Sequence, residues 1–596
     1  MPKLKKNNGN SNGMADQKLS NLRHSLSHLL AAAVKEIYPD AKPTLGPAIE
    51  NGFYYDFDDL NISDGDLPII EAKMKEILPS WEKFEGKEIT EEEVRNYFKN
   101  NPYKLELIDE ILSKGEKITL YTSGPPTGGF TDLCRGGHID NPSKIDPRSF
   151  KLSHIAGAYW RGNEKNKMLT RIYGLAFSTK EELKEYLKMQ EEAEKRDHRI
   201  LGKELGLFIF SDLVGPGLPL YTPKGNVLRN EIVNFSRELN NKIGYEEVHT
   251  PNINKAELFK ISGHYEKYKE DMLEVKTHYS KEEYFLKPMN CPQHTQIYAS
   301  QTRSYRDLPI RIADFANLYR DERPGELSGL TRLRYFAQDD GHCFCTEEQI
   351  EEEFLKILGV VEEALKTYKM QYTIWLSLRD LAKKEKYVGT DEVWEDAEEI
   401  LRKILKKQKI NFIEKEGEAA FYGPKMDIVV KDAIGREWQI STIQLDFNMP
   451  ERFGLKFADH DGKEKTPIMI HRALVGSPDR FLGILIEHYA GAFPVWLSPI
   501  QVKILPIGEA HQKFAQQIFD ALKESGIRAE LDDSNETLGK KIRNWKIEKI
   551  PYAIVIGDKE VESKKIKVES RDKGDLGQVS SEEFTKNLKE EISDKK

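Results

Sequence analysis

The sequence predicts an α+β protein built from several domains. Its 596 residues correspond to about four domains at a typical ~150 residues each. Hydrophobic residues make up 39% of the chain, which is enough apolar material for several cores. Helical and extended apolar segments alternate irregularly from 201 to 498, which favours an antiparallel sheet. Strands and helices then alternate at short spacing from 499 to 596, which predicts an α/β domain with a mainly parallel sheet.

Composition and charge exclude several classes of protein. Four cysteines in 596 residues cannot form a disulfide framework, so a reducing, cytoplasmic location is expected. No apolar run of about 18 residues occurs, and the first residues lack an apolar signal segment, so no membrane partner is expected. The net charge of −9 gives no argument for a nucleic-acid partner, which would have to be bound by local basic patches.

The N-terminal third predicts a polar arm followed by a mixed domain. Residues 1–18 are polar and without periodicity, so we expect a disordered arm. A helix is predicted from near Leu19 to the stop at Pro39, because apolar residues recur at helical spacing at Leu22, Leu26, Leu29, Leu30 and Val34. Mixed helix and strand patterning over 19–178 predicts one domain, with strands at 118–123 and 168–177.

A charged segment separates this domain from the next. Residues 179–200 are dense in Glu and Lys with a narrow apolar stripe, which predicts a solvated linker helix. The block from 201 to 498 then predicts a helix at 226–244 and strands at 372–378 and 437–447.

Two histidine and cysteine pairs share a four-residue spacing. His24 and His28 lie on one face of the predicted helix, and Cys134 and His138 follow in TDLCRGGH. Such a set suits a Zn²⁺ site, and it suits equally a hydrolytic pocket that positions a water without metal. The residues themselves leave both alternatives open.

A second set is dispersed over the large block. Cys291, His342 and His471 give the donor types of a catalytic zinc site, in which three protein ligands leave a position open for water or substrate. Cys343 and Cys345 alternate with Phe344 in an apolar strand and are predicted to be core residues.

Arginines and a carboxylate cluster around a Pro/Gly turn. Arg320, Glu322, Arg332 and Arg334 lie in YRDERPGELSGLTRLR, and Arg480 precedes an apolar helix. Guanidinium groups from separate strands can converge on a polyphosphate. No GxxxxGK[ST] loop occurs, so a nucleotide would have to be held in another way.

Together these segments resemble the class II aminoacyl-tRNA synthetases. NKIGYEEVHTPNI (241–253) is similar to motif 1, which forms the dimer interface in that class; the segment around Arg320 is similar to motif 2, and GSPDRF to motif 3. MNCPQH, QDDGHCFCTEEQ, FYGPKMDI, WQISTIQLDFNMPERF and MIHRALVGS resemble the bacterial-type threonyl-tRNA synthetases, as do HSLSH and CRGGH. The resemblance runs from about residue 20 to the C-terminus. The family usually carries a ubiquitin-like domain before the editing domain, and here we expect only the short arm.

The resemblance implies the chemistry of the large block. Zn²⁺ on Cys291, His342 and His471 would bind threonine through its amino and hydroxyl groups, which rejects the isostere valine because the metal would lack an oxygen ligand. Further threonine contacts are implied for Gln338, Asp340, Tyr422 and Gln444. ATP, with Mg²⁺ bridging its phosphates, would be bound by Arg320, Glu322, Arg332 and Arg480, the three arginines being the implied catalytic residues.

The similarity of serine to threonine implies a second, hydrolytic site. Serine lacks only a methyl group, worth about 1–3 kcal/mol or roughly 10–200-fold, which is too little for faithful translation. By resemblance, His24, His28, Cys134, His138 and, more weakly, Asp132 would hydrolyse seryl-tRNA(Thr). The implied partners are tRNA(Thr), ATP, L-threonine and a second copy of the chain.

The C-terminal domain would bind the anticodon. Its segment 536–549 carries a local set of basic residues, Lys540, Lys541, Arg543 and Lys546, which would equally suit a solvated helix face. Asn535, Arg543 and Glu560 match family positions that contact anticodon bases. Glu569 stands where a basic residue is expected, with Arg571 two positions on, so one base contact is expected to be altered or shifted.

Three other functions compete with the one that the resemblance implies. A deacylase with a decayed synthetase core is disfavoured by the intact metal and arginine sets. A synthetase-like RNA-binding regulator would bind RNA without either activity. A serine or proline synthetase is disfavoured by the Cys/His/His set and the editing pairs.

Overall fold

The chain forms two compact units, one that ends at Glu191 and one that runs from Glu192 to Lys596. The computed structural model describes residues 12–125 and 129–596. The prediction of a disordered arm at 1–18 falls outside the described residues for 1–11. The prediction is wrong for residues 12–18, because the first helix begins at Asn12, upstream of the predicted start near Leu19; Met14, Ala15, Gln17 and Lys18 are good helix formers that extend it at little cost.

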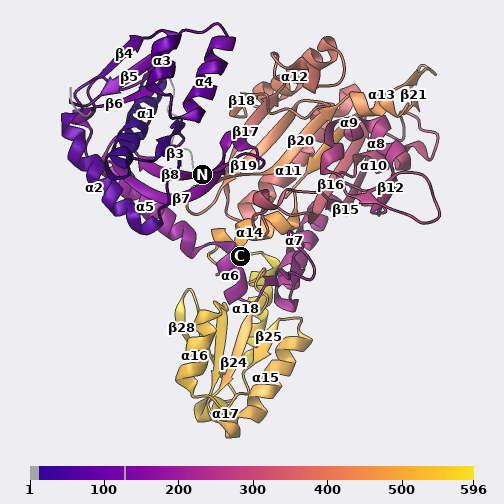
Figure 1. The fold of residues 1–596 in the computed structure, drawn as a ribbon. Helices are drawn as coiled ribbons and strands as arrows, with labels where there is room; N and C mark the ends of the chain where they lie inside the picture. Colours follow the sequence, from indigo (N-terminus) through magenta and orange to yellow (C-terminus); the bar gives the residue numbers. More distant parts are fainter. Residues whose placement is uncertain (1–11, 126–128) are drawn as a thin grey trace. The chain divides into compact units, whose positions relative to one another are not determined.

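The N-terminal unit packs helix α1 (Asn12–Ile37) on a sheet of strand order β1-β3-β8-β7 (Figure 1). Leu26, Leu29, Leu30 and Val34 of α1 are buried in the core, as the apolar periodicity predicted. The sheet consists of β1 (Lys42–Pro43), β2 (Ala48–Ile49, paired with β3), β3 (Gly52–Asp58), β7 (Phe150–Tyr159) and β8 (Met168–Ala176).

A second, smaller sheet and four further helices complete this unit. The strands are β4 (Phe84–Glu88), β5 (Thr119–Ser123) and β6 (Phe130–Leu133), in that order. The helices are α2 (Leu67–Ile77), α3 (Glu91–Tyr97), α4 (Pro102–Ser113) and α5 (Lys180–Lys195), whose last four residues belong to the second unit. The predicted linker segment 179–200 contains α5 and the start of α6 (His198–Glu204).

The second unit contains an eight-stranded sheet of order β11-β15-β16-β23-β20-β19-β17-β18 (Figure 1). Its six central strands pair antiparallel, as predicted, and only the edge strands β11 and β18 pair parallel. The strands are β11 (Glu246–Glu247), β15 (Ile310–Tyr319), β16 (Tyr335–Cys345), β17 (Gln371–Leu378), β18 (Phe412–Glu416), β19 (Lys425–Lys431), β20 (Glu437–Asp446) and β23 (Ile468–Ala473).

One face of this sheet is the main core of the unit. Cys343 and Cys345 of β16 pack there with Ile470 of β23 and Leu445 of β20. The helices in contact with this core are α7 (Pro223–Lys242), α11 (Ile350–Thr367), α12 (Asp391–Lys407) and α14 (Pro478–His488). The two cysteines are therefore core residues, as predicted. Because side chains alternate along a strand, His342 and its alternate neighbours face the other side.

The C-terminal sheet has the order β25-β24-β26-β27-β28. The prediction of a mainly parallel sheet is wrong for half of it, because β26, β27 and β28 pair antiparallel. A parallel return needs a crossover of about a dozen residues, and the stretch between β26 and β27 is shorter. The strands are β24 (Val502–Pro506), β25 (Ala529–Leu531), β26 (Tyr552–Ile556), β27 (Ile566–Ser570) and β28 (Gly574–Val579).

Helices α15 (Gln512–Glu524), α16 (Leu538–Ile547), α17 (Asp558–Ser563) and α18 (Ser581–Ser593) accompany these strands. Within the described ranges, the helices are too short or too polar to span a lipid bilayer.

Candidate active site

Three strands of the large sheet line up functional side chains in one row. His342 of β16 lies opposite His471 of β23, which lies opposite Gln444 of β20. Residues in register on neighbouring strands share a face of the sheet, so the three side chains project to the same side. This side is opposite the main core.

Cys291 completes a cluster with the two histidines. It is the first residue of helix α10 (Cys291–Ala299), and one ligand atom from each of Cys291, His342 and His471 lies within 4.8 Å of the others. His342 Nε2 is 3.1 Å from His471 Nδ1, and all three residues are buried. The structure thus brings together the three predicted ligands, hereafter the Cys–His–His cluster.

The outer ring nitrogens of the cluster are hydrogen-bonded, which fixes the rings. His471 Nε2 lies 2.9 Å from Asp446 Oδ2, and His342 Nδ1 lies 2.7 Å from His294 Nδ1. Asn290 Nδ2 in turn contacts His294 Nε2 at 2.8 Å. Zinc-binding histidines typically have such partners on their second nitrogen. A sulfur, two imidazole nitrogens and this support fit a zinc ion with an open position.

The predicted threonine contacts surround the cluster. Asp340 lies two residues before His342 on the same face of β16, and its Oδ1 is 3.8 Å from His342 Nε2. Burial raises the pKa of Asp340 to about 7. The Tyr422 hydroxyl donates a hydrogen bond to Gln444 Oε1, and the Tyr422 ring stacks on His471 with centroids 4.7 Å apart. Gln338 lies two residues before Asp340, toward the next cavity.

A cavity of about 490 Å³ adjoins the cluster along the same strands. Ala473 and Thr442 face each other two residues from His471 and Gln444, and both line this cavity. Two residues of strand correspond to about 7 Å. The cavity also contains the predicted nucleotide residues, Arg320, Glu322, Arg332 and Arg480, together with Gln338. We call it the arginine cavity.

Arg320 and Arg480 are the cations of this cavity that lack a carboxylate partner, since no ion pair joins either side chain to an acid in the described part of the chain. Burial lowers the pKa of both guanidinium groups. Arg480 Nε is buried without a hydrogen-bond partner among residues 12–125 and 129–596. A desolvated, unpaired cation is stabilised by an anion, so these two arginines suit phosphate.

Arg332 is held differently from the other two arginines. Its Nε donates to Glu322 Oε2 at 2.8 Å, and its Nη2 donates to Glu326 Oε2 at 2.9 Å. Arg332 is predicted to bind ATP and to take part in catalysis. Either role would require its guanidinium to exchange these two carboxylates for phosphate oxygens. Arg334, also singled out in the sequence, donates from Nε to the Glu322 carbonyl oxygen and supports the loop instead.

The N-terminal unit brings together the other predicted set. His24, His28, Cys134 and His138 each offer an atom within 4.8 Å of the others, and we call them the N-terminal His/Cys cluster. Cys134 Sγ lies 3.7 Å from His24 Nε2 and 3.3 Å from His138 Nε2. The cluster borders a cavity of about 320 Å³ that His24, His28, Asp132 and Cys134 line.

Burial keeps this cluster uncharged. Desolvation lowers the pKa of His24, takes that of His28 well below its usual value, and lowers that of His138 to about 2. Desolvation raises the pKa of Cys134 to about 11. The cluster therefore presents neutral imidazoles and a thiol, not a thiolate.

The sequence reasoning missed residues beside both clusters. Lys104 forms an ion pair with Asp132, which also accepts a hydrogen bond from the Tyr55 hydroxyl, and all three are buried. The signal for Lys104 was its place on the apolar face of α4, one turn before Ile108. In the second unit, His264 Nε2 lies 3.9 Å from Cys291 Sγ, and nothing in the local pattern pointed to it.

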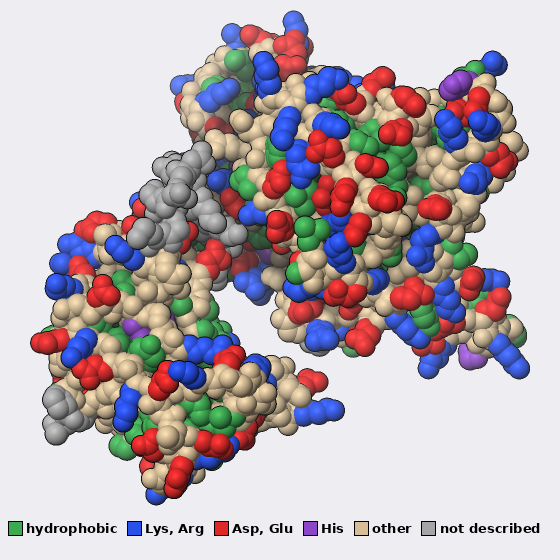
Figure 2. Space-filling model, turned by 90° about the horizontal axis from the view of Figure 1, so that it is seen from above, with side chains coloured by type: hydrophobic (Ala, Val, Ile, Leu, Met, Phe, Trp, Pro, Cys, Tyr) green, Lys and Arg blue, Asp and Glu red, His purple; other side chains and the backbone are tan. Residues whose placement is uncertain are grey.

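The predicted anticodon residues differ in exposure. Asn535 and Arg543 are exposed. Glu560 is buried, accepts from Gly557 N at 2.9 Å and from Gln578 Nε2 at 2.7 Å, and so supports its own helix. Lys541, expected in a basic patch, is buried, because its ammonium donates to the carbonyl oxygens of Pro506 and Asp532. Figure 2 draws one face of the whole molecule, on which basic and acidic side chains are interspersed.

Three family models match parts of the chain. The tRNA synthetase class II core domain (G, H, P, S and T) matches residues 273–489, and an anticodon binding domain matches 501–591. The threonyl and alanyl tRNA synthetase second additional domain matches 118–173, which includes Cys134 and His138.

Curated relatives match almost the whole chain. The threonine–tRNA ligase of Thermotoga petrophila is 48% identical over 578 residues, which is 96% of this chain and 88% of that one. The threonine–tRNA ligase of Thermus thermophilus is 48% identical over 93% of this chain and 86% of its own length. A solved RNA binding domain of threonyl-tRNA synthetase from Cryptosporidium parvum covers 66% of this chain and 98% of its own, with a TM-score of 0.63 and 38% identity. With a Cys–His–His cluster, an arginine cavity and an N-terminal His/Cys cluster carried on this fold, the chain belongs to the threonine–tRNA ligase family of class II synthetases.

Proposed function

We propose that the chain activates L-threonine with ATP, transfers it to tRNA(Thr), and hydrolyses seryl-tRNA(Thr) formed in error. The observation that carries the proposal is the position of the Cys–His–His cluster two strand residues from the arginine cavity on one sheet face. An amino acid at the cluster would have its carboxylate beside a phosphate in the cavity. The carboxylate is itself the nucleophile, so positioning and charge stabilisation carry this step.

The Cys–His–His cluster would hold Zn²⁺. Bound there, zinc would supply a Lewis acid that accepts both the amino group and the hydroxyl of threonine. Asp340 would stabilise the amino group, and Tyr422 with Gln444 would form the wall on the side of His471. Valine offers a methyl in place of the hydroxyl and would leave the site short of an oxygen ligand, which is a large penalty.

ATP, accompanied by Mg²⁺, would occupy the arginine cavity. Arg320 and Arg480 would bind phosphate oxygens, which would remove the cost of burying two unpaired guanidinium groups. Gln338 would lie between the nucleotide and the amino acid. The role of Arg320 and Arg480 would be to neutralise the charge that develops on the phosphate while the adenylate forms.

The N-terminal His/Cys cluster would hydrolyse the serine ester. Of its imidazoles, His24 has the least strongly lowered pKa and would accept a proton from water, whereas the raised pKa of Cys134 argues against a thiolate nucleophile. Asp132 and Lys104 would position groups of the substrate in the adjoining cavity. The cluster would also accept a metal by its donor set, and the hydrolysis proposed here requires none.

A homodimer and a cytoplasmic location complete the proposal. The segment 208–220 exposes five apolar side chains, Ile209, Phe210, Leu213, Val214 and Leu220, which a second copy would cover. The C-terminal domain would bind the anticodon through Asn535 and Arg543. A Leu213→Asp variant that elutes as a monomer, from a dimeric parent, would support the interface.

The decisive test is amino-acid-dependent ATP–pyrophosphate exchange by zinc-replete protein. We expect exchange with threonine, weak exchange with serine, and almost none with valine or proline. Deacylation of seryl-tRNA(Thr) without any exchange would instead identify a deacylase. Binding of RNA with neither activity would identify an RNA-binding regulator.

A further inference from the structure

A buried histidine outside both clusters contacts the loop that carries Arg332. His198, the first residue of α6, is 3% exposed. Its Nε2 accepts a hydrogen bond from the Leu330 backbone N–H at 2.9 Å, and its Nδ1 donates to Glu487 Oε1 at 2.6 Å. A backbone N–H can only donate and a carboxylate only accept, so the ring must be neutral with its proton on Nδ1.

The loop is shaped to admit this ring. Gly329 has φ +49°, and a Cβ added there would lie 2.1 Å from His198 Nε2. A Cβ on Gly483 of α14 would lie 3.2 Å from the Leu330 Cβ and 3.5 Å from His198 Cδ2. Two glycines from separate segments thus allow His198 to lie against the backbone of residues 329–330.

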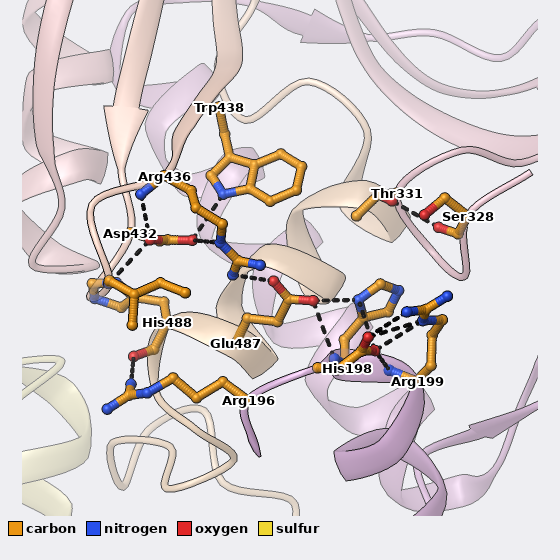
Figure 3. Close-up of polar contacts among 12 residues, drawn as sticks. Arg196, His198, Arg199, Ser328, Thr331, Asp432, Arg436, Trp438, Glu487 and His488 are labelled. Atoms are coloured by element: carbon orange, nitrogen blue, oxygen red, sulfur yellow. Dashed lines mark hydrogen bonds and ion pairs between the residues drawn. The ribbon is translucent and has the colours of Figure 1, made fainter. Parts of the chain in front are cut away.

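The carboxylate that holds His198 is itself anchored. Glu487 Oε1 also accepts from the His198 backbone N–H at 3.1 Å, while Glu487 Oε2 accepts from Arg436 (Figure 3). Asp432 Oδ2 accepts from Arg436 Nε at 2.7 Å and from Trp438 Nε1 at 3.0 Å. This buried network joins α6, α14 and the β19–β20 turn, and it therefore holds the His198 ring in a fixed position. Asp197, His198 and Glu487 also lie close enough together to form a third potential metal site. However, both ring nitrogens of His198 are already hydrogen-bonded, to Glu487 and to Leu330.

The loop that His198 holds forms one wall of the arginine cavity. Leu330, Thr331 and Arg332 all line it. Thr331 donates from Oγ1 to the Ser328 carbonyl oxygen at 2.7 Å, and the backbone N–H groups of Thr331 and Arg332 donate to the same oxygen, so residues 328–332 form a closed turn (Figure 3). A contact at Leu330 therefore sets the position of Arg332, two residues away.

We propose that His198 is a positioning residue for ATP: its neutral ring holds residues 328–332 so that Arg332 can reach the nucleotide. The inference rests on the function proposed above. Between the described residues, the hydrogen bond to Leu330 is the polar contact that joins His198 to the wall of the cavity, and the bond to Glu487 keeps the ring in place.

Two substitutions separate these two contacts. In His198→Asn, the side-chain amide N–H can still donate to Glu487 but no acceptor reaches Leu330 N–H. In His198→Gln, the longer side chain places its amide oxygen where Nε2 lies and keeps the acceptor. Each removes one buried hydrogen bond, so both should lower the melting temperature to a similar extent. ATP binding, measured by titration calorimetry with Mg²⁺, should weaken about tenfold in His198→Asn and less than threefold in His198→Gln.

A matched histidine provides the control. His511 in the C-terminal domain also accepts a backbone N–H, from Gly508 at 3.0 Å, and contacts a carboxylate, Asp558 Oδ1 at 2.9 Å. His511→Asn should leave ATP affinity unchanged. Gly329→Ala, which moves the loop away from His198, should weaken ATP binding as His198→Asn does, while the Km for threonine stays within twofold in every variant.

Equal ATP affinity in His198→Asn and His198→Gln would overturn the inference, as would an equal loss in His511→Asn. Because the readout is ATP binding, it is separate from the proposed function. A parent that binds ATP but lacks threonine-dependent exchange would contradict the ligase function while the comparison of the variants still decides the role of His198.

Discussion

His342 and His471 lie directly opposite each other on adjacent antiparallel strands, with Nε2 of the first 3.1 Å from Nδ1 of the second. Two imidazole nitrogens that share one metal ion are held at about this separation, since each lies about 2.0–2.1 Å from it. Asp446 and His294 bind their outer nitrogens and hold both rings in this geometry.

Removal of the sulfur ligand should abolish metal binding. Cys291→Ser is expected to lose the zinc that the parent retains after gel filtration and, with it, threonine-dependent exchange, because a hydroxyl is a poor substitute for thiolate. The zinc content is measured by inductively coupled plasma mass spectrometry. Cys345→Ala, which removes a core thiol on the same strand as His342, should keep the zinc. A zinc-free Cys291→Ser protein with unchanged exchange would contradict the metal role.

Replacement of a cavity arginine by a neutral residue should impair the use of ATP. Arg480→Gln is expected to lower kcat/Km for ATP in the exchange reaction by about 100-fold, as loss of one preorganised donor to a developing charge typically does. The zinc content should not change. Arg402→Gln on α12, where the guanidinium pairs with Glu414 at 2.9 Å, is the control and should behave as the parent. A loss confined to the threonine Km would argue against the phosphate assignment.

Editing should depend on the helix histidines. With His24→Ala and His28→Ala combined, threonylation of tRNA is expected to continue at the parental rate while seryl-tRNA(Thr) accumulates, because the imidazole that accepts the proton from water and the ring packed against it are gone. Deacylation of purified seryl-tRNA(Thr) measures this directly. His154→Ala, in the same unit on β7, should hydrolyse it as the parent does. Persistence of hydrolysis in the double variant would mean that the editing site lies elsewhere.

The reactivity of Cys134 should follow its raised pKa. Because only thiolate is alkylated and the pKa of Cys134 is about 11, chelator-treated protein should react about ten times faster for each unit of pH between 7 and 9. An ordinary thiol would approach a plateau above about 8.5. Iodoacetamide labelling followed by peptide mass spectrometry gives the rate at this one residue. A plateau below pH 9 would show that the thiol ionises more readily than its burial implies.

The sequence predicted the elements and site residues whose signals are local or shared with a family. The apolar spacing of Leu26, Leu30 and Val34 is sufficient to place the core face of α1. The alternation of Cys343 and Cys345 around Phe344 likewise separates core from site. In both cases the periodicity of one helix or strand carries the information.

Features that depend on contacts between distant segments could not be predicted in this way. Lys541 looked like a surface cation, and only the two carbonyl oxygens that its ammonium reaches explain its burial. In the sequence, His198 is a single histidine in a charged segment. Its proposed role depends on contacts with Gly329 and Glu487, each more than a hundred positions away along the chain. The antiparallel return of β27 depends on the length of one connection, which apolar patterning does not report.

The alignment of His342, His471 and Gln444 across three strands means that, if they bind zinc and threonine as proposed, the pairing register itself determines substrate choice. Deletion of a single residue within β23 upstream of His471 would turn its imidazole into the hydrophobic interior and bring a neighbouring apolar side chain to the reactive surface. Metal capture and amino-acid discrimination would vanish in one event, without change to any of the chemical groups involved. For the predicted metal site, the length of this strand is therefore as restrictive as the identity of His471.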